Sequence, residues 1–136
     1  MKLMGFNFSK ISIEQTGKRK PETKIKTNLD VIEIVDAKSD VLKSKETILV
    51  VKFEYSINYT PDYAKLEFEG NIIISLESKE AKIVLKEWKK KKMSENFKMK
   101  LFNIILMKSN VKALQLEEEM NLPYHIPLPS IKPKKE

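Results

Sequence analysis

Two long stretches of alternating residues, joined by one turn, constrain the fold of this chain more than any other feature. Residues 48–59 and 64–76 each place apolar or aromatic side chains at every second position. Such a period of two is typical of β-strands with one apolar and one polar face. The four residues from Thr60 to Tyr63, with Pro61 second, suit a type I turn. The sequence therefore predicts one long antiparallel hairpin.

Two further strands are predicted before the hairpin. Residues 6–13 alternate, but their parity changes between Phe8 and Ile11, and a β-bulge between these two residues explains the change. Residues 24–35 form the second strand, again with a change of parity. The polar residues 37–45 then connect this strand to the hairpin.

After the hairpin the pattern becomes helical. Residues 78–88 carry apolar side chains at spacings of three and four, and Ser78 is a suitable N-cap. Ser94 is suitable as the N-cap of a second helix over residues 95–119. We therefore expect one α+β domain over residues 1–136, in which a four-stranded antiparallel sheet is followed by two helices packed on one face.

The second helix is apolar on more than one side. One stripe runs from Phe97 through Ile104 to Val111. Met93, Met99 and Met107 could suit an adaptable client surface, although methionines at helical spacing are more often core. A helix with two apolar sides must bury both. We therefore predict an oligomer interface formed by Leu101, Phe102, Ile105 and Leu106.

Composition places the chain with globular proteins, since 41% of the residues are hydrophobic and 33% are charged. The apolar runs are too short to span a membrane and the start lacks a signal peptide, so we expect a cytoplasmic protein without membrane insertion. The net charge of +7 suggests a nucleic-acid-binding module as one alternative. The basic residues, however, gather in a loop, at a helix end and in the tail, where solubilising charge is common.

Little in the sequence points to catalysis. The chain has no cysteine, its three glycines are scattered, and its only histidine, His125, has no neighbouring residues suited to metal binding or acid–base work. Residues 117–119, all Glu, are typical of a solvated helix end. We expect no enzyme activity, no metal and no cofactor. Residues 121–136 are rich in Pro and predict an extended C-terminal arm that ends in a frayed tail.

The order of elements resembles the SecB family of protein-export chaperones. The resemblance rests on residues 8–13 (Phe-Ser-Lys-Ile-Ser-Ile), on the alternating stretch 66–74 and on the Pro-containing arm 122–129. The composition, rich in Lys and Ile with Glu as the main acid, indicates an archaeal or thermophile member. Familiar SecB proteins are acidic, whereas this chain is basic, which puts handover to a translocation motor in doubt.

The resemblance implies an ATP-independent holdase that binds unfolded or nascent polypeptides in apolar grooves and assembles as a dimer of dimers. It also implies, as an alternative, a SecB-like chaperone of a toxin–antitoxin system. A helix about 10–12 Å wide covers about two strands spaced roughly 4.7–4.9 Å apart. The rest of the apolar face then meets a client, another subunit or the arm. We predict that clients contact Phe6, Phe8, Phe53, Tyr55, Ile57, Tyr59, Tyr63, Leu66 and Phe68.

Overall fold

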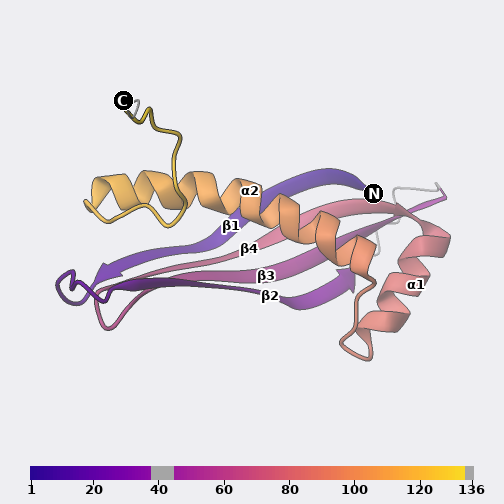
Figure 1. The fold of residues 1–136 in the computed structure, drawn as a ribbon. Helices are drawn as coiled ribbons and strands as arrows, with labels where there is room; N and C mark the ends of the chain where they lie inside the picture. Colours follow the sequence, from indigo (N-terminus) through magenta and orange to yellow (C-terminus); the bar gives the residue numbers. More distant parts are fainter. Residues whose placement is uncertain (38–44, 134–136) are drawn as a thin grey trace.

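The predicted hairpin forms the centre of a four-stranded antiparallel sheet in the computed structural model, which describes residues 1–37 and 45–133. The strand order is β1-β4-β3-β2, and the two helices follow the last strand along the chain (Figure 1). This α+β architecture confirms the predicted fold class. The elements are β1 (Lys2–Gln15), β2 (Lys24–Asp36), β3 (Glu46–Thr60), β4 (Ala64–Glu77), α1 (Ser78–Trp88) and α2 (Glu95–Glu119).

Bulges occur on both edge strands. The pairing of β1 with β4 shifts between Phe8 and Lys10, as the parity change predicted, and shifts again near Met4. The pairing of β2 with β3 shifts between Val31 and Glu33. An extra residue restores the apolar face after each change of parity, and it also interrupts an edge that could otherwise pair with another chain. The connection predicted for residues 37–45 lies mostly outside the described residues, as do the last three residues of the arm.

The turn of the central hairpin differs from the predicted type I turn. The Thr60–Pro61 peptide bond is cis, Asp62 has a φ of 42°, and the backbone N–H of Tyr63 donates to the carbonyl of Tyr59. The hydrogen bond therefore closes five residues instead of four. Asp accepts a positive φ because its short polar side chain can bond locally.

The helices begin at different kinds of cap. Ser94 caps α2 as predicted, since its hydroxyl accepts the backbone N–H of Phe97. Ser78 does not cap α1, because it is already the first helical residue and Glu77 precedes it without a side-chain cap. The Ser78 hydroxyl instead lies 3.0 Å from that of Thr47 on β3. No helix among the described residues is long and apolar enough to span a membrane.

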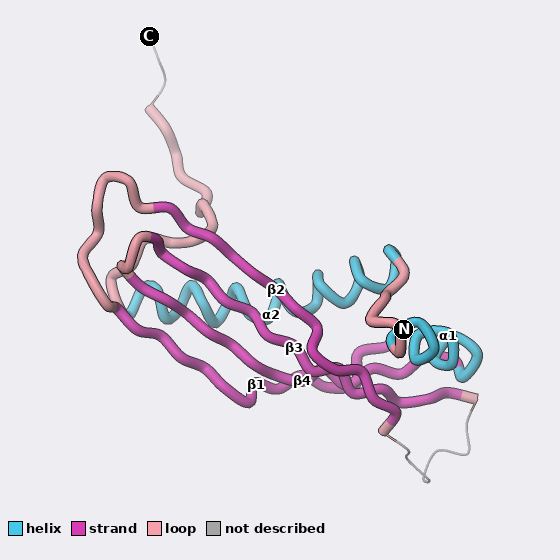
Figure 2. The backbone as a smooth tube through the Cα atoms, turned by 90° about the horizontal axis from the view of Figure 1, so that it is seen from below, coloured by secondary structure: helices cyan, strands magenta, loops and turns pink. Residues whose placement is uncertain are grey.

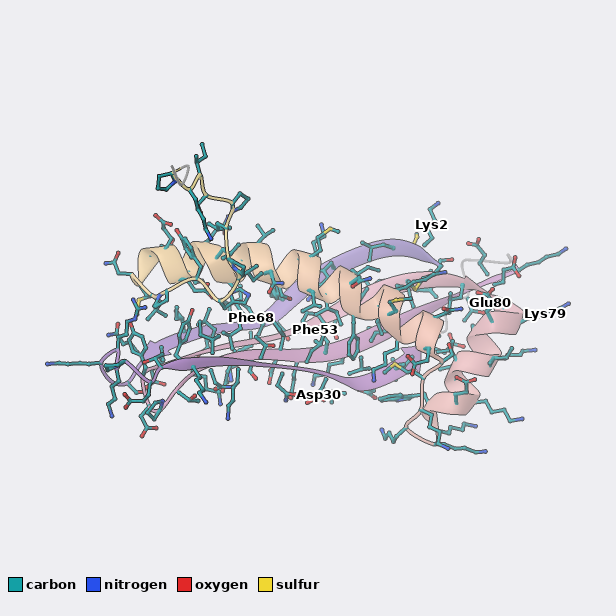
Figure 3. The ribbon with its side chains drawn as sticks, in the orientation of Figure 1. Lys2, Asp30, Phe53, Phe68, Lys79 and Glu80 are labelled. Carbon is teal, nitrogen blue, oxygen red and sulfur yellow. The ribbon has the colours of Figure 1, made fainter. Side chains whose placement is uncertain are left out.

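Helix α2 runs over one face of the sheet, while α1 lies at its end (Figures 1 and 2). The fully buried strand residues are on β3 and β4, apart from Ile34 on β2, and β1 has none. Phe53 and Phe68 accordingly lie between the sheet and α2, whereas Asp30 lies on the opposite side (Figure 3). The helix thus covers the two central strands and leaves the apolar sides of both edge strands partly open.

The buried stripe of α2 differs from the predicted one. It follows a strict spacing of four residues: Phe97, Leu101, Ile105, Ser109, Ala113 and Glu117. The second half of this stripe is small or polar, so apolar periodicity did not reveal it. Leu101 and Ile105 have no exposed surface, because they pack against the sheet of their own chain. Their predicted role in an oligomer interface therefore needs correction, and only Phe102 and Leu106 retain exposed area for such a contact.

Candidate functional site

A row of aromatic rings leads from the edge of the sheet to its centre. The ring of Phe6 stacks on that of Phe53 with centroids 5.4 Å apart, and Phe6 meets Phe8 edge-on at 5.1 Å. Phe8 then approaches Phe68 at 5.7 Å, and Phe68 stacks with Tyr55 at 6.1 Å. Aromatic pairs at such distances add stability beyond the burial of their area. Phe6 and Phe8 on β1 thus form the partly open end of a continuous aromatic surface.

The structure divides the nine predicted client-binding residues into two groups. Phe6 and Phe8 are half-buried beside the core. The other seven are at most 5% exposed, because α2 and the C-terminal arm cover them: Phe53, Tyr55, Ile57, Tyr59, Tyr63, Leu66 and Phe68. These seven residues therefore pack under the helix and the arm. In this conformation they cannot contact a client directly.

The partly open surface continues along both edge strands. On β1, Ile11 pairs with Phe68 and is 43% exposed, while Ile13 is half-buried. On the far side of α2, the half-buried residues of β2 are Ile25, Leu29 and Val31. Directly opposite residues of antiparallel strands point to the same face, so these side chains flank the helix. We call the β1 group, formed by Phe6, Phe8, Ile11 and Ile13, the β1 flank.

The C-terminal arm closes the end of this face. The chain turns at Asn121, whose φ is 53°, and the backbone N–H of Leu122 donates to the carbonyl of Glu117 at 2.8 Å. Leu122 is 5% exposed, and the hydroxyl of Tyr59 donates to the carbonyl of Pro123. The start of the predicted arm is therefore docked on the domain, whereas residues 127–133 are exposed.

A buried polar cluster fixes the docked part of the arm. The side chains of His125 and Glu117 are 2% and 0% exposed, and His125 Nδ1 lies 2.7 Å from Glu117 Oε2. Its Nε2 lies 2.8 Å from Asn110 Oδ1, which also accepts the hydroxyl of Tyr55 at 2.8 Å. The cluster therefore links α2, the sheet and the arm. Both ring nitrogens of His125 are engaged in these contacts.

The tyrosine hydroxyls in this region act as donors. Burial, assisted by the negative charge of Glu117, raises the pKa of Tyr55 to about 12. The same two causes, burial first, raise the pKa of Tyr59. Sequence reasoning missed Glu117, which the run of three Glu assigned to a solvated helix end, and it missed Asn110. The one sequence feature that pointed to this buried cluster was the single His in the Pro-rich arm.

The other face of the sheet is polar and mixed in charge. Lys10 and Lys65 both bind Glu67, at 2.8 and 2.6 Å, and their hydrogen bonds lower the pKa of Glu67 to about 2. Glu69, Glu54 and Asp30 lie opposite one another on three adjacent strands. This face therefore presents more acids than a surface that tracks phosphates would carry.

A second exposed apolar surface lies on the solvent side of α2. Met99, Met107 and Val111 are 58%, 70% and 58% exposed, so these two methionines lie outside the core, whereas Met93 packs against it. Phe102 and Leu106 are half-buried nearby on the same helix. No group of three or more His, Cys, Asp or Glu residues within 1–37 and 45–133 is arranged to hold a metal ion.

No protein-family model matches the sequence, and no curated protein matches it. In structure the chain is similar to the SecB-like chaperone Rv1957 of Mycobacterium tuberculosis, solved in complex with a ChAD peptide from the Rv1956 HigA1 antitoxin. The two chains share 13% sequence identity and superpose with a TM-score of 0.47, over 98% of this chain and 92% of the other.

Proposed function

We propose that this protein is an ATP-independent chaperone that holds non-native polypeptides on its partly open apolar surface. The observation that carries the proposal is the β1 flank, where Phe6 and Phe8 connect a partly exposed edge to a buried aromatic row. Exposed contiguous apolar surface on a folded protein commonly marks a contact with another polypeptide. Phe side chains suit such contacts because they bury much area with few rotatable bonds.

Extended apolar segments of a client would lie along the β1 flank, beside α2. Apolar burial without directional polar groups gives binding with little sequence selectivity, as a holdase requires. The bulges between Leu3 and Gly5 and between Phe8 and Lys10 interrupt the strand edge. Side-chain burial would therefore contribute more to client binding than backbone pairing with β1.

Release of the arm offers a larger surface. The arm covers Tyr59 and Tyr63, whose rings meet edge-on at 5.7 Å, and fills the adjoining space with Leu122. Displacement of the arm would add these residues to the client surface, in line with the wider site predicted from the sequence. Binding at the β1 flank does not need this displacement.

The more specific chaperone functions differ from one another only in the partner that the protein would serve. Service to a toxin–antitoxin system is the same holdase function with a dedicated client, and export is the same function with a translocation partner. A nucleic-acid-binding module has less support, because the polar sheet face carries the acids Asp30, Glu54 and Glu69. We further propose a cytoplasmic location and an even-numbered assembly of chains.

An aggregation assay tests the proposal. The wild-type protein should suppress aggregation of a chemically denatured model protein on dilution, without ATP. The variant Ile11→Ser, made at a 43% exposed position of the β1 flank, should weaken suppression several-fold. Phe8→Ala should weaken it further.

The matched control is Val35→Ser. Val35 is 40% exposed on an edge strand, but it pairs with Val50 on the opposite face of the sheet. This variant should suppress aggregation as well as the wild type does. Equal loss in both serine variants, or no suppression by the wild-type protein at any ratio to client, would refute the proposal. Circular dichroism of each variant separates loss of binding from loss of fold.

A further inference from the structure

The basic charge of the chain is concentrated at one corner. Residues 78–100 span α1, the connection to α2 and the first turns of α2. They contain nine Lys and three Glu, a difference of +6, within a chain of net charge +7. The positive end of the α2 dipole, at Ser94, points toward the same corner. The rest of the chain is therefore almost neutral. A partner with negative charge would be attracted to this corner first.

The same corner is hollowed. One depression of 570 Å³ lies between the second half of α1 and the connection to α2, and another of 310 Å³ lies between α1, the start of α2 and Met1. Ile83 and Ser94 line both depressions. Figures 1 and 2 show α1 at the end of the sheet, away from most of α2. Because the two depressions share Ile83 and Ser94, we treat them together and call them the α1 groove.

The floor of the α1 groove is apolar and its rim is basic. Ile83 on α1 is 57% exposed, and Val84, Met93 and Phe97 line the groove with it. The basic rim consists of Lys86, Lys90, Lys92 and Lys100, all exposed. None of these four lysines forms an ion pair with an acid of the described residues. Glu80 and Glu87 are the acids in the lining.

We propose that the α1 groove docks an acidic amphipathic polypeptide segment of a partner protein. Its apolar side chains would cover Ile83 and its carboxylates would meet the lysine rim. Charge complementarity selects the partner, because unpaired lysines around an apolar floor favour carboxylates next to apolar groups. Nucleic acid fits less well, since the lining has no exposed aromatic ring for stacking and two of its side chains are acids.

This inference does not depend on the proposed holdase function. The α1 groove lies on other residues than the β1 flank, and its partner binds as a recognised segment instead of as a non-native client. The two surfaces could therefore serve two partners on one chain. Anisotropy of labelled peptides tests the groove, whereas aggregation assays test the flank.

The probe is a labelled synthetic peptide of Glu and Leu in helical spacing. Three matched probes are the same peptide with Lys for Glu, the same peptide with Ser for Leu, and a single-stranded oligonucleotide of equal net charge. The Glu-Leu peptide should bind at least about tenfold more tightly than each of the three. Its affinity should fall as salt approaches about 1 M, where the Debye length shrinks to about 3 Å.

Substitutions in the α1 groove test whether the Glu-Leu peptide binds there. Ile83→Ser, and separately the pair Lys86→Glu with Lys90→Glu, should each weaken binding about tenfold. The control pair Lys18→Glu with Lys20→Glu makes the same charge change in the exposed loop between β1 and β2 and should stay within about twofold of wild type. Ile83→Ser should leave aggregation suppression unchanged. Equal binding of the Lys-Leu peptide, tighter binding of the oligonucleotide, or an equal loss in the control pair would overturn the proposal.

Discussion

Glu117 holds His125 through both its backbone and its ring. Glu117 Oε1 accepts the backbone N–H of His125 at 3.0 Å, while the ring Nδ1 lies 2.9 Å from Oε1 and 2.7 Å from Oε2. Both side chains are almost completely buried. One carboxylate at the end of α2 thus fixes the direction of the chain eight residues later. The placement of the arm over the aromatic face follows from this contact.

Removal of either side chain of the Glu117–His125 pair should destabilise the protein, and the loss of the His125 ring should do so strongly. His125→Ala leaves the Glu117 carboxylate buried without its ring contacts, which costs about 3–5 kcal/mol where a buried pair is broken in this way. Urea unfolding monitored by circular dichroism measures the change. Glu117→Gln should cost less, since an amide oxygen can still accept the backbone N–H.

The neighbouring Glu119→Gln is the matched control, because Glu119 is exposed on the same helix end. It should change the free energy of unfolding by less than about 0.5 kcal/mol. If His125→Ala were as mild as Glu119→Gln, the arm would not be fixed by this pair. Limited proteolysis after Asn121 would report the same release of the arm independently.

Alkaline pH should destabilise the protein through Tyr55. The phenol of an unfolded chain loses its proton near pH 10, whereas the folded protein holds it until about 12. Between these values the unfolded state binds fewer protons, so the free energy of unfolding falls as pH rises. Below pH 10 the contribution of Tyr55 is fully present.

Tyr55→Phe should remove part of this alkaline slope, because Phe does not titrate. Denaturant unfolding of both proteins from pH 9 to pH 12 would measure it (about the range over which phenols ionise). Spectrophotometric titration should show that Tyr55 and Tyr59 ionise above the usual range of a phenol, because burial raises the pKa of both. Ionisation of Tyr55 and Tyr59 near pH 10, in still-folded protein, would contradict the burial of this pair.

The strands could be predicted from sequence because their apolar faces are continuous. The bulge after Phe8 could be predicted from one change of parity, because an extra residue is needed to return Ile11 to the apolar face of the sheet. The buried stripe of α2 could not be predicted in the same way. Ser109, Ala113 and Glu117 lie on it, and small or charged residues give no apolar period.

The candidate site was less predictable than the fold. Alternation assigns Tyr55 and Tyr59 to the apolar face but does not show what covers them. That depends on the arm, whose position follows from the contact between His125 and Glu117, and the sequence pattern assigns Glu117 to a solvated helix end. Long-range polar contacts of this kind have no local signature. The β1 flank was predictable only as the half of the sheet that one helix leaves open.

Gly70 should not tolerate a side chain. A Cβ at Gly70 would collide with the carbonyl oxygen of Asn7 and would lie 2.7 Å from the ring of Phe53. Both positions are fixed, one by β1 pairing and the other by ring stacking. Gly70→Ala should therefore cost about 1–3 kcal/mol, as overpacking does in a filled core.

Gly5→Ala is its control on the neighbouring strand. The nearest atom to a Cβ at Gly5 is the side chain of Ile73 at 3.4 Å, an ordinary contact. Thermal unfolding should show a clear loss for Gly70→Ala and little change for Gly5→Ala. Similar unfolding temperatures for the two variants would mean that β1 or Phe53 can move aside at little cost.

We predict that the chain assembles through the exposed face of α2. Met107 and Val111 are 70% and 58% exposed, and Phe102 and Leu106 are half-buried nearby, so a lone chain leaves apolar surface in water. Two copies that use the same patch would form a closed assembly. We predict a dimer or tetramer in light scattering. Leu106→Glu should dissociate it while the fold persists, because an unpaired charge in an apolar contact is costly.

The variant Leu101→Glu distinguishes a core position of α2 from an interface position. Leu101 has no exposed surface and packs on the sheet, so this variant should lose its fold instead of only its partner. Circular dichroism and light scattering on the same samples distinguish the two outcomes. A monomeric mass for the wild-type protein would exclude the interface. Dissociation without unfolding in Leu101→Glu would show that α2 does not pack on its own sheet as the structure has it.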